Sequence, residues 1–192
     1  MVVRGVIHTI VAAFLLGGAL SPVLADEPRS GDAVIEDFTM QPETRWRFFT
    51  DEVMGGVSTG HVAFAQEDGT SFARMTGRVS TENRGGFIQM RLDLSLPPPD
   101  GTTGVRLIVR GNGQRYFVHL RTGGTLLPWQ YYQAGFDVTE SWREVRLPLA
   151  AFSASGVLLR SLPAPGSLTS FAVVAFGRDH DARIDVREIG FY

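Results

Sequence analysis

The feature of this sequence that most restricts its fold is a period-two alternation of side chains that recurs along the chain. In residues 105–110, the apolar residues Val105, Leu107 and Val109 alternate with Arg106, Ile108 and Arg110. Residues 116–121 continue the pattern. Residues 87–92 place Ile88, Met90 and Leu92 on one side. Strands that bury one face and expose the other require this alternation. The sequence therefore predicts an all-β protein with antiparallel strands.

Turn residues separate the expected strands. The chain contains 22 glycines and 10 prolines, and a Glu67-Asp68-Gly69 turn between two short alternating runs is typical of a β-hairpin. Residues 171–176 are apolar on both faces, which favours a central strand. Loops are expected at 96–101 and 153–170. We expect strands at 34–38, 62–64, 72–75, 87–92, 105–110, 116–121, 129–136, 142–147, 171–176 and 184–192. Strands of this number and length indicate a single-domain β-sandwich or jelly roll.

The N-terminus has the pattern of a secretory signal peptide. Arg4 is followed by an apolar run over residues 6–20, a Ser21-Pro22 break and a small residue at Ala25. An uncleaved membrane anchor is the alternative, but the run is shorter than the roughly 20 apolar residues of a spanning helix. We expect cleavage after Ala25, a mature domain over residues 26–192 without a membrane span, and a periplasmic or secreted location.

Composition excludes several classes of function. The chain has no cysteine, which removes disulfides, thiol catalysis and cysteine-based zinc sites. A formal net charge of −2 with interspersed signs gives no electrostatic basis for binding nucleic acid.

No motif for catalysis or cofactor binding emerges. Residues 56–60 match the G-x-S-x-G pattern around Ser58, but strand-forming residues follow where a nucleophile elbow needs a helix. The histidines after residue 25 lack zinc-site spacing. Residues 179–181 (Asp-His-Asp) offer oxygens for Ca²⁺, yet a solvated hairpin turn is favoured, and 111–113 (Gly-Asn-Gly) also indicates a hairpin turn. We expect no catalytic residue, no metal and no cofactor.

Three segments are too unusual to be generic turns. Residues 46–58 contain D-E-V-M-G-G-V-S, residues 82–87 contain N-R-G-G-F, and residues 110–116 contain R-G-N-G-Q-R-Y, followed by a Tyr-Gln pair and Trp142. Together, and in this order, they resemble the complex I intermediate-associated protein 30 family over nearly the whole mature chain. The resemblance implies a galactose-binding-like jelly roll that is not an enzyme. Mitochondrial members are chaperone-like assembly factors for respiratory complex I. An exported member could meet that complex only at the outer face of its membrane arm, so the resemblance implies the fold rather than this partner, because function lies in sites rather than folds.

The glycine-rich loops either pack on each other or line a binding groove. For the groove we expect a concavity with these lining residues: Asp51, Met54, Gly55, Gly56, Ser58, Asn83, Gly85, Gly86, Phe87, Arg110, Tyr116, Arg121, Tyr131 and Gln133.

Three functions stay open at this point. The favoured one is a non-catalytic binding or assembly module for a protein partner. The alternative is a carbohydrate-binding module that uses the aromatic residues Trp46, Tyr116, Trp129, Tyr131 and Trp142. An enzyme for glycan cleavage would need two facing carboxylates, and nothing in the sequence pairs two of the acids Asp51, Glu52, Glu82 and Asp137.

Overall fold

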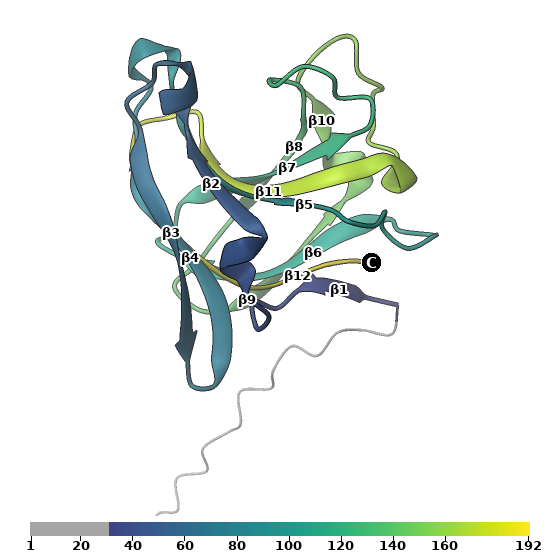
Figure 1. Cartoon of the computed structure of the whole chain (residues 1–192), viewed down its shortest axis with the longest axis horizontal. Helices are drawn as coiled ribbons and strands as arrows, with labels where there is room; N and C mark the ends of the chain where they lie inside the picture. Colours follow the sequence, from purple (N-terminus) through teal and green to yellow (C-terminus); the bar gives the residue numbers. More distant parts are fainter. Residues whose placement is uncertain (1–30) are drawn as a thin grey trace, which may run out of the picture.

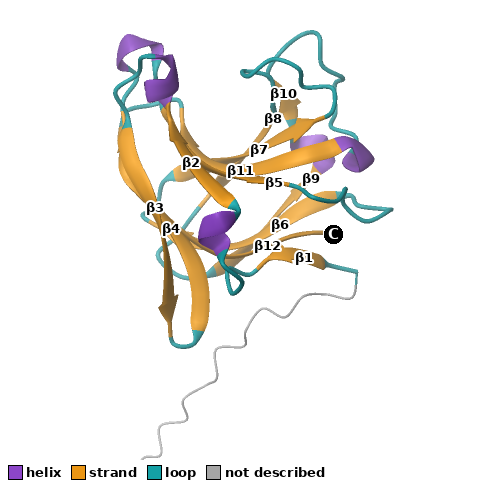
Figure 2. Ribbon diagram, in the orientation of Figure 1, coloured by secondary structure: helices purple, strands orange, loops and turns teal. Residues whose placement is uncertain are grey.

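The computed structural model of the chain describes residues 31–192, which form two stacked antiparallel β-sheets (Figures 1 and 2). The expected signal peptide lies outside the described residues. In the first sheet, the long strand β12 pairs at one end with β4 and at the other with β1, while β6 runs along its opposite edge. The strand order is β3 (Thr59–Glu67), β4 (Thr70–Val79), β12 (His180–Phe191), β6 (Gly104–Gly111) and β9 (Arg143–Pro148), with β1 (Ala33–Glu36) added beside β12.

The second sheet has β11 between β7 and β5, as the two-sided apolar pattern of residues 171–176 predicts. Its strand order is β10 (Ser153–Ala154), β8 (Tyr132–Asp137), β7 (Arg115–Thr122), β11 (Leu168–Phe176), β5 (Phe87–Asp93) and β2 (Trp46–Thr50). The all-β jelly-roll prediction is confirmed.

The core lies between the sheets, where the inward residues of each alternating strand meet. Met75 and Ile184 from the first sheet and Val118 and Val173 from the second have no exposed surface. Burying a side chain of this size contributes about 1.5–3 kcal/mol. A chain without cysteine therefore relies on this apolar layer for its stability.

Two turns differ from the sequence prediction, and one agrees. The β3–β4 hairpin turns at Asp68 and Gly69, whose φ angles are 50° and 76°, as a tight hairpin turn requires. Residues 111–113 and 179–181 are not hairpin turns, because each carries the chain from one sheet to the other. Turn residues mark where a strand ends, but they carry no information on which sheet receives the next strand.

Strand boundaries show where the alternation was too weak to detect. Strand β2 was missed because it places two aromatic residues, Phe48 and Phe49, side by side in a five-residue edge strand. Strand β10 is only two residues long. Between residues 31 and 192, five 3-10 helices occupy connections: η1 (Pro42–Thr44), η2 (Asp51–Met54), η3 (Glu82–Arg84), η4 (Leu149–Ala151) and η5 (Pro165–Ser167). Within residues 31–192, no helix has the length and apolarity to cross a bilayer.

Candidate functional site

The loops that carry η2 and η3 meet at one end of the second sheet, at the upper left of Figure 1, and are joined through Asp51. This side chain is fully buried. It accepts hydrogen bonds from the backbone N–H of Ser58 at 2.9 Å, of Gly86 at 2.5 Å and of Phe87 at 3.2 Å, and from the Ser58 hydroxyl at 2.5 Å. One carboxylate therefore links two loops that are distant in sequence.

The glycines of these loops have steric roles around the same carboxylate. A Cβ atom on Gly56 would lie 2.3 Å from Cγ of Asp51, and one on Gly85 would lie 2.3 Å from its Oδ2. Gly55 has a φ of 86° and Gly86 a φ of 128°, conformations that favour glycine. The M-G-G-x-S and G-G-F motifs are thus accounted for by packing around Asp51.

The negative charge of Asp51 is stabilised by hydrogen-bond donors within the loops. Burial raises the pKa of this carboxyl group, but the hydrogen bonds from Ser58, Gly86 and Phe87 outweigh that effect and lower the pKa overall. Asp51 is therefore ionised and fully engaged with donors. Its two oxygens face the chain's own N–H and O–H groups rather than solvent.

The structure separates the predicted groove residues into several places. Met54 and Asn83 are exposed at the tips of the loops, whereas Asp51, Ser58 and Gly86 are buried. The expectation of a single concavity is therefore incorrect for the buried members. The motif spacing located the loops correctly but carried no information on the direction of each side chain.

Tyr116 and Arg110 also lie away from any shared groove. Tyr116 belongs to the core with no exposed surface; its hydroxyl donates to Oδ1 of Asn112 at 2.8 Å and accepts from the Arg183 N–H at 2.7 Å. Burial raises the pKa of Tyr116 to about 12. Arg110 lies on the outer face of the first sheet, where it pairs with Asp185 and Glu67.

The remaining four predicted residues, Phe87, Arg121, Tyr131 and Gln133, lie together on the outer face of the second sheet. Several outward positions of its strands carry aromatic rings. We call this surface the aromatic face; its rings are partly exposed except for the mostly buried His119, and they belong to Phe49, Phe87, Phe117, His119, Tyr131 and Phe176.

Ring contacts connect the members of the aromatic face. The rings of His119 and Tyr131 stack with centroids 3.9 Å apart and an interplanar angle of 8°. Phe176 contacts both Phe117 and His119 edge to face, at 6.0 Å and 5.8 Å. These contacts arrange the rings side by side without a ligand.

His119 is held neutral at the centre of this face. Burial lowers its pKa to about 4, although the contact between its Nε2 and Oε1 of Gln133, 2.8 Å long, acts in the opposite direction. The imidazole therefore serves as an uncharged flat ring that also orients the Gln133 amide.

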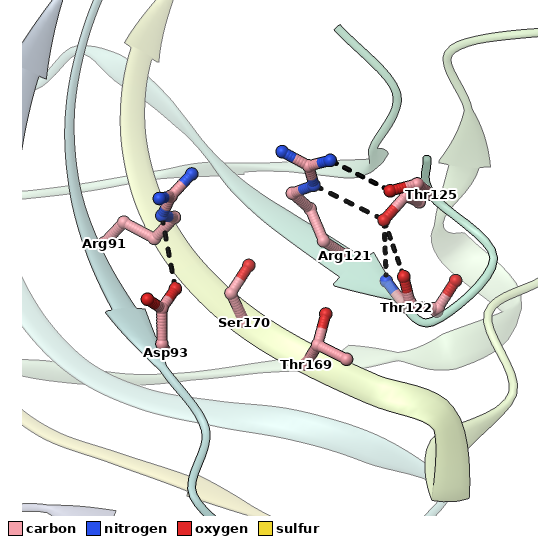
Figure 3. A pocket seen from close by; sticks show the side chains of 7 residues that line it. All are labelled: Arg91, Asp93, Arg121, Thr122, Thr125, Thr169 and Ser170. Atoms are coloured by element: carbon pink, nitrogen blue, oxygen red, sulfur yellow. Dashed lines mark hydrogen bonds and ion pairs between the residues drawn. The ribbon is translucent and has the colours of Figure 1, made fainter. Parts of the chain in front are cut away.

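A polar pocket of about 240 Å³ adjoins the aromatic face at the end of the sheet opposite the Asp51 loops (Figure 3). We call it the arginine pocket, and its lining residues are Arg91, Asp93, Arg121, Thr122, Thr125, Thr169 and Ser170. Arg121 follows His119 by two positions on β7, so that the pocket and the aromatic face share one surface.

The local backbone aims several polar groups into this pocket. The pairing of β11 with β7 shifts register between Leu168 and Ser170, and such an irregularity redirects side chains. In Figure 3 the hydroxyls of Thr169 and Ser170 point to the same side as the two guanidinium groups. Arg121 is positioned by the loop that follows it, because its guanidinium donates to the backbone carbonyls of Thr125 and Leu127 at 2.9 Å and 3.1 Å.

Much of this surface carries no motif in the sequence. Its residues Arg91, Phe49, Phe117 and Phe176 occupy the outward positions of ordinary strands, where no local pattern marks them as site residues. The available signal was an excess of aromatic and arginine residues at positions where an exposed strand face usually carries small polar side chains. Across residues 31–192, no group of three or more His, Asp or Glu side chains is placed to hold a metal ion.

Comparison with solved structures confirms the jelly-roll β-sandwich fold. A family 11 carbohydrate-binding module of the cellulase Lic26A-Cel5E from Clostridium thermocellum aligns with a TM-score of 0.68 and 9% identity, over 84% of this chain and 94% of that one. An exo-β-agarase aligns with a TM-score of 0.56 and 8% identity, over 83% of this chain and 24% of the agarase. A family 30 carbohydrate-binding module gives 0.51 and 14%, over 69% and 73%.

Sequence comparison gives the family. No curated protein sequence matches the chain. Residues 37–177, however, match the family described as complex I intermediate-associated protein 30 (CIA30). That range runs from the end of β1 to the end of β11 and includes both motif loops, the aromatic face and the arginine pocket. The chain belongs to the CIA30 family.

Proposed function

We propose that this protein is a non-catalytic binding module that holds a glycan chain against the aromatic face. The observation that carries the proposal is the row of partly exposed rings on the outer side of the second sheet, ordered by stacking and flanked by arginine, glutamine and hydroxyl groups. The CIA30 family and the carbohydrate-module fold are both typical of proteins without catalytic activity.

The chemistry of the surface suits a sugar polymer. Flat rings provide apolar contact for the C–H face of a pyranose, and polar groups beside them orient its hydroxyls, which is the combination that small-ligand sites use. The solved relatives support this choice, since one family 11 module is described in complex with a β-1,3-1,4-mixed-linked tetrasaccharide. The signal-peptide pattern of residues 1–25 supports a location outside the cytoplasm, where polysaccharides are available.

Affinity electrophoresis tests the proposal. The mature chain is run through gels that contain mixed-linkage glucan, agarose-type galactan or polygalacturonate, and we expect retardation by at least one polymer. Tyr131→Ala should weaken that retardation about tenfold or more, because stacked aromatic contacts of this kind contribute roughly 1–3 kcal/mol.

The matched control is Trp142→Ala, which removes a half-buried aromatic residue from the outer face of the first sheet. It should be retarded like the wild type. If Tyr131→Ala and wild type migrate alike in the polymer that binds, the aromatic face is not the binding surface.

A protein partner is a second candidate, favoured by a different observation. The loops 123–131 and 155–165, joined by hydrogen bonds from and to the Ser155 hydroxyl, contain no acidic residue and expose large apolar side chains. Those most exposed are Leu126, Trp129, Val157 and Leu158. Exposed apolar groups concentrated on neighbouring loops mark surfaces for macromolecular contact.

This candidate is tested by pull-down with the mature chain and a Leu126→Ser, Leu158→Ser double variant. One protein captured in stoichiometric amount by wild type and lost by the folded variant would favour it. Equal capture by both proteins would remove it.

A further inference from the structure

We infer that the glycan recognised by this protein is acidic, and that the arginine pocket binds one of its carboxylate or sulfate groups. The inference rests on the proposed glycan-binding function and specifies its ligand class. It follows from the charge, the free hydrogen-bonding groups and the position of the pocket.

The charge of this region is unbalanced. Arg47, Arg91 and Arg121 lie in or beside the pocket, and the carboxylate that accompanies them is Asp93. Asp93 pairs closely with Arg47 and lies 3.4 Å from Nε of Arg91, while Arg121 contacts carbonyl and hydroxyl oxygens and has no carboxylate partner among residues 31–192. An added anion would restore the balance.

Free hydrogen-bonding groups point to where that anion would lie. Nε of Arg91 is buried and makes no hydrogen bond within residues 31–192, although it lies 3.4 Å from Oδ1 of Asp93 in a long ion pair. The Thr169 and Ser170 hydroxyls point into the pocket beside it. Buried polar groups are nearly always satisfied, and arginine with hydroxyls is a suitable donor set for carboxylate or sulfate oxygens. Burial is the main cause of the lowered pKa of Arg91; Asp93 opposes it, and the positive charges of Arg47 and Arg121 add to the lowering.

The position of the pocket indicates a glycan rather than a free ion. It opens on the same surface as the aromatic face, next to the His119–Tyr131 stack. A sugar that packs on these rings would carry its acidic substituent toward Arg91 and Arg121. Inorganic sulfate would use the pocket alone and gain nothing from the rings.

Isothermal titration calorimetry with four probes tests the inference: an oligogalacturonate, a sulfated galactan oligosaccharide, a neutral mixed-linkage glucan tetrasaccharide and sodium sulfate. We expect an acidic oligosaccharide to bind at least tenfold more tightly than the neutral one. Its affinity should fall as salt rises, because ionic contacts at a partly exposed site are screened.

The decisive variants are Arg91→Gln and Arg121→Gln, with Arg91→Lys to retain the charge. Each glutamine variant should lose about tenfold or more in affinity for the acidic probe, since hydrogen bonds to charged groups contribute about 1.5–3 kcal/mol, and Arg91→Lys should recover part of the loss. Arg78→Gln, which removes an exposed arginine from β4 in the first sheet, is the matched control and should bind like the wild type.

Three results would overturn the inference. Equal binding of neutral and acidic probes, unaffected by the arginine variants, would reject the acidic ligand while leaving glycan binding intact. Binding of sulfate alone would identify a simple anion site. Binding of no oligosaccharide would reject the proposed function together with the inference.

Discussion

The two outer faces of the sandwich are built from the same kind of strand, but their charges differ: arginines are paired with carboxylates on one face and outnumber them on the other. On the first sheet, Arg106 is fully buried and pairs with Glu144 and Glu188, and Arg74 and Arg110 share Asp185. On the second sheet, arginines exceed carboxylates around the pocket, and the rest of the surface is aromatic. The ion pairs of the first face are formed within the chain, whereas an anionic ligand, as we propose, would balance the arginines of the second.

The loops around Asp51 resemble the outer face of the first sheet, because their charged group is also satisfied by partners within the chain. Every hydrogen bond to the carboxylate comes from the chain itself. The segments that stand out most in the sequence are therefore structural, and the surface with unmet polar groups is marked by no motif.

The largest expected difference between the faces concerns stability. Arg106→Met should destabilise the protein by about 3–5 kcal/mol, because it takes from Glu188 the cation with which it pairs and leaves Glu144 and Asp32 to share Arg146 alone. Arg91→Met on the second sheet should change stability by less than about 1 kcal/mol. Urea unfolding monitored by tryptophan fluorescence measures both, and similar losses for the two variants would contradict the contrast between the faces.

A smaller effect is expected in the loops. Gly85→Ala should cost about 1–3 kcal/mol, because its Cβ would overlap Oδ2 of Asp51. Gly123→Ala, where no atom lies within 4 Å of the added carbon, is the matched control and should be nearly neutral. If the folded Gly85→Ala variant keeps its stability and loses glycan affinity, these loops are part of the binding surface after all.

The pH dependence of folding stability, set by His119, is expected to be as large as the effect of Gly85→Ala or smaller. The folded-state pKa of His119, about 4, is below the ordinary value of 6.5, so the unfolded chain binds the extra proton first. The contribution of neutral His119 to the free energy of unfolding is therefore fully present above pH 6.5. It falls as the pH drops toward 4, by about 1–2 kcal/mol at pH 5. His119→Phe should flatten this part of the stability curve; an unchanged curve would show that His119 is not held neutral by the aromatic face.

The sequence allowed the strands and the sheet-forming alternation to be predicted, because burial of one face imposes a period of two on residues such as those in β6 and β7. It also located the loops at 51–58 and 82–87. It did not show that Asp51 and Tyr116 point inward, since a hydrogen-bonding side chain looks the same in sequence whether its partner is the protein or a ligand. The arginine pocket depends on Arg91, Arg121 and Ser170, which are brought together from three strands by the sheet order, and no local pattern encodes that order.

Ligand binding on the outer face of the second sheet can be located residue by residue. A backbone-amide NMR titration of the mature chain with an oligogalacturonate, and in parallel with a mixed-linkage glucan tetrasaccharide, makes this test. We expect shifts confined to residues 89–93, 117–122, 131–133 and 169–176 with at least one of the two sugars. Shifts confined to the loops at 51–58 and 82–87 or to the first sheet, or no shift with either sugar, would contradict it.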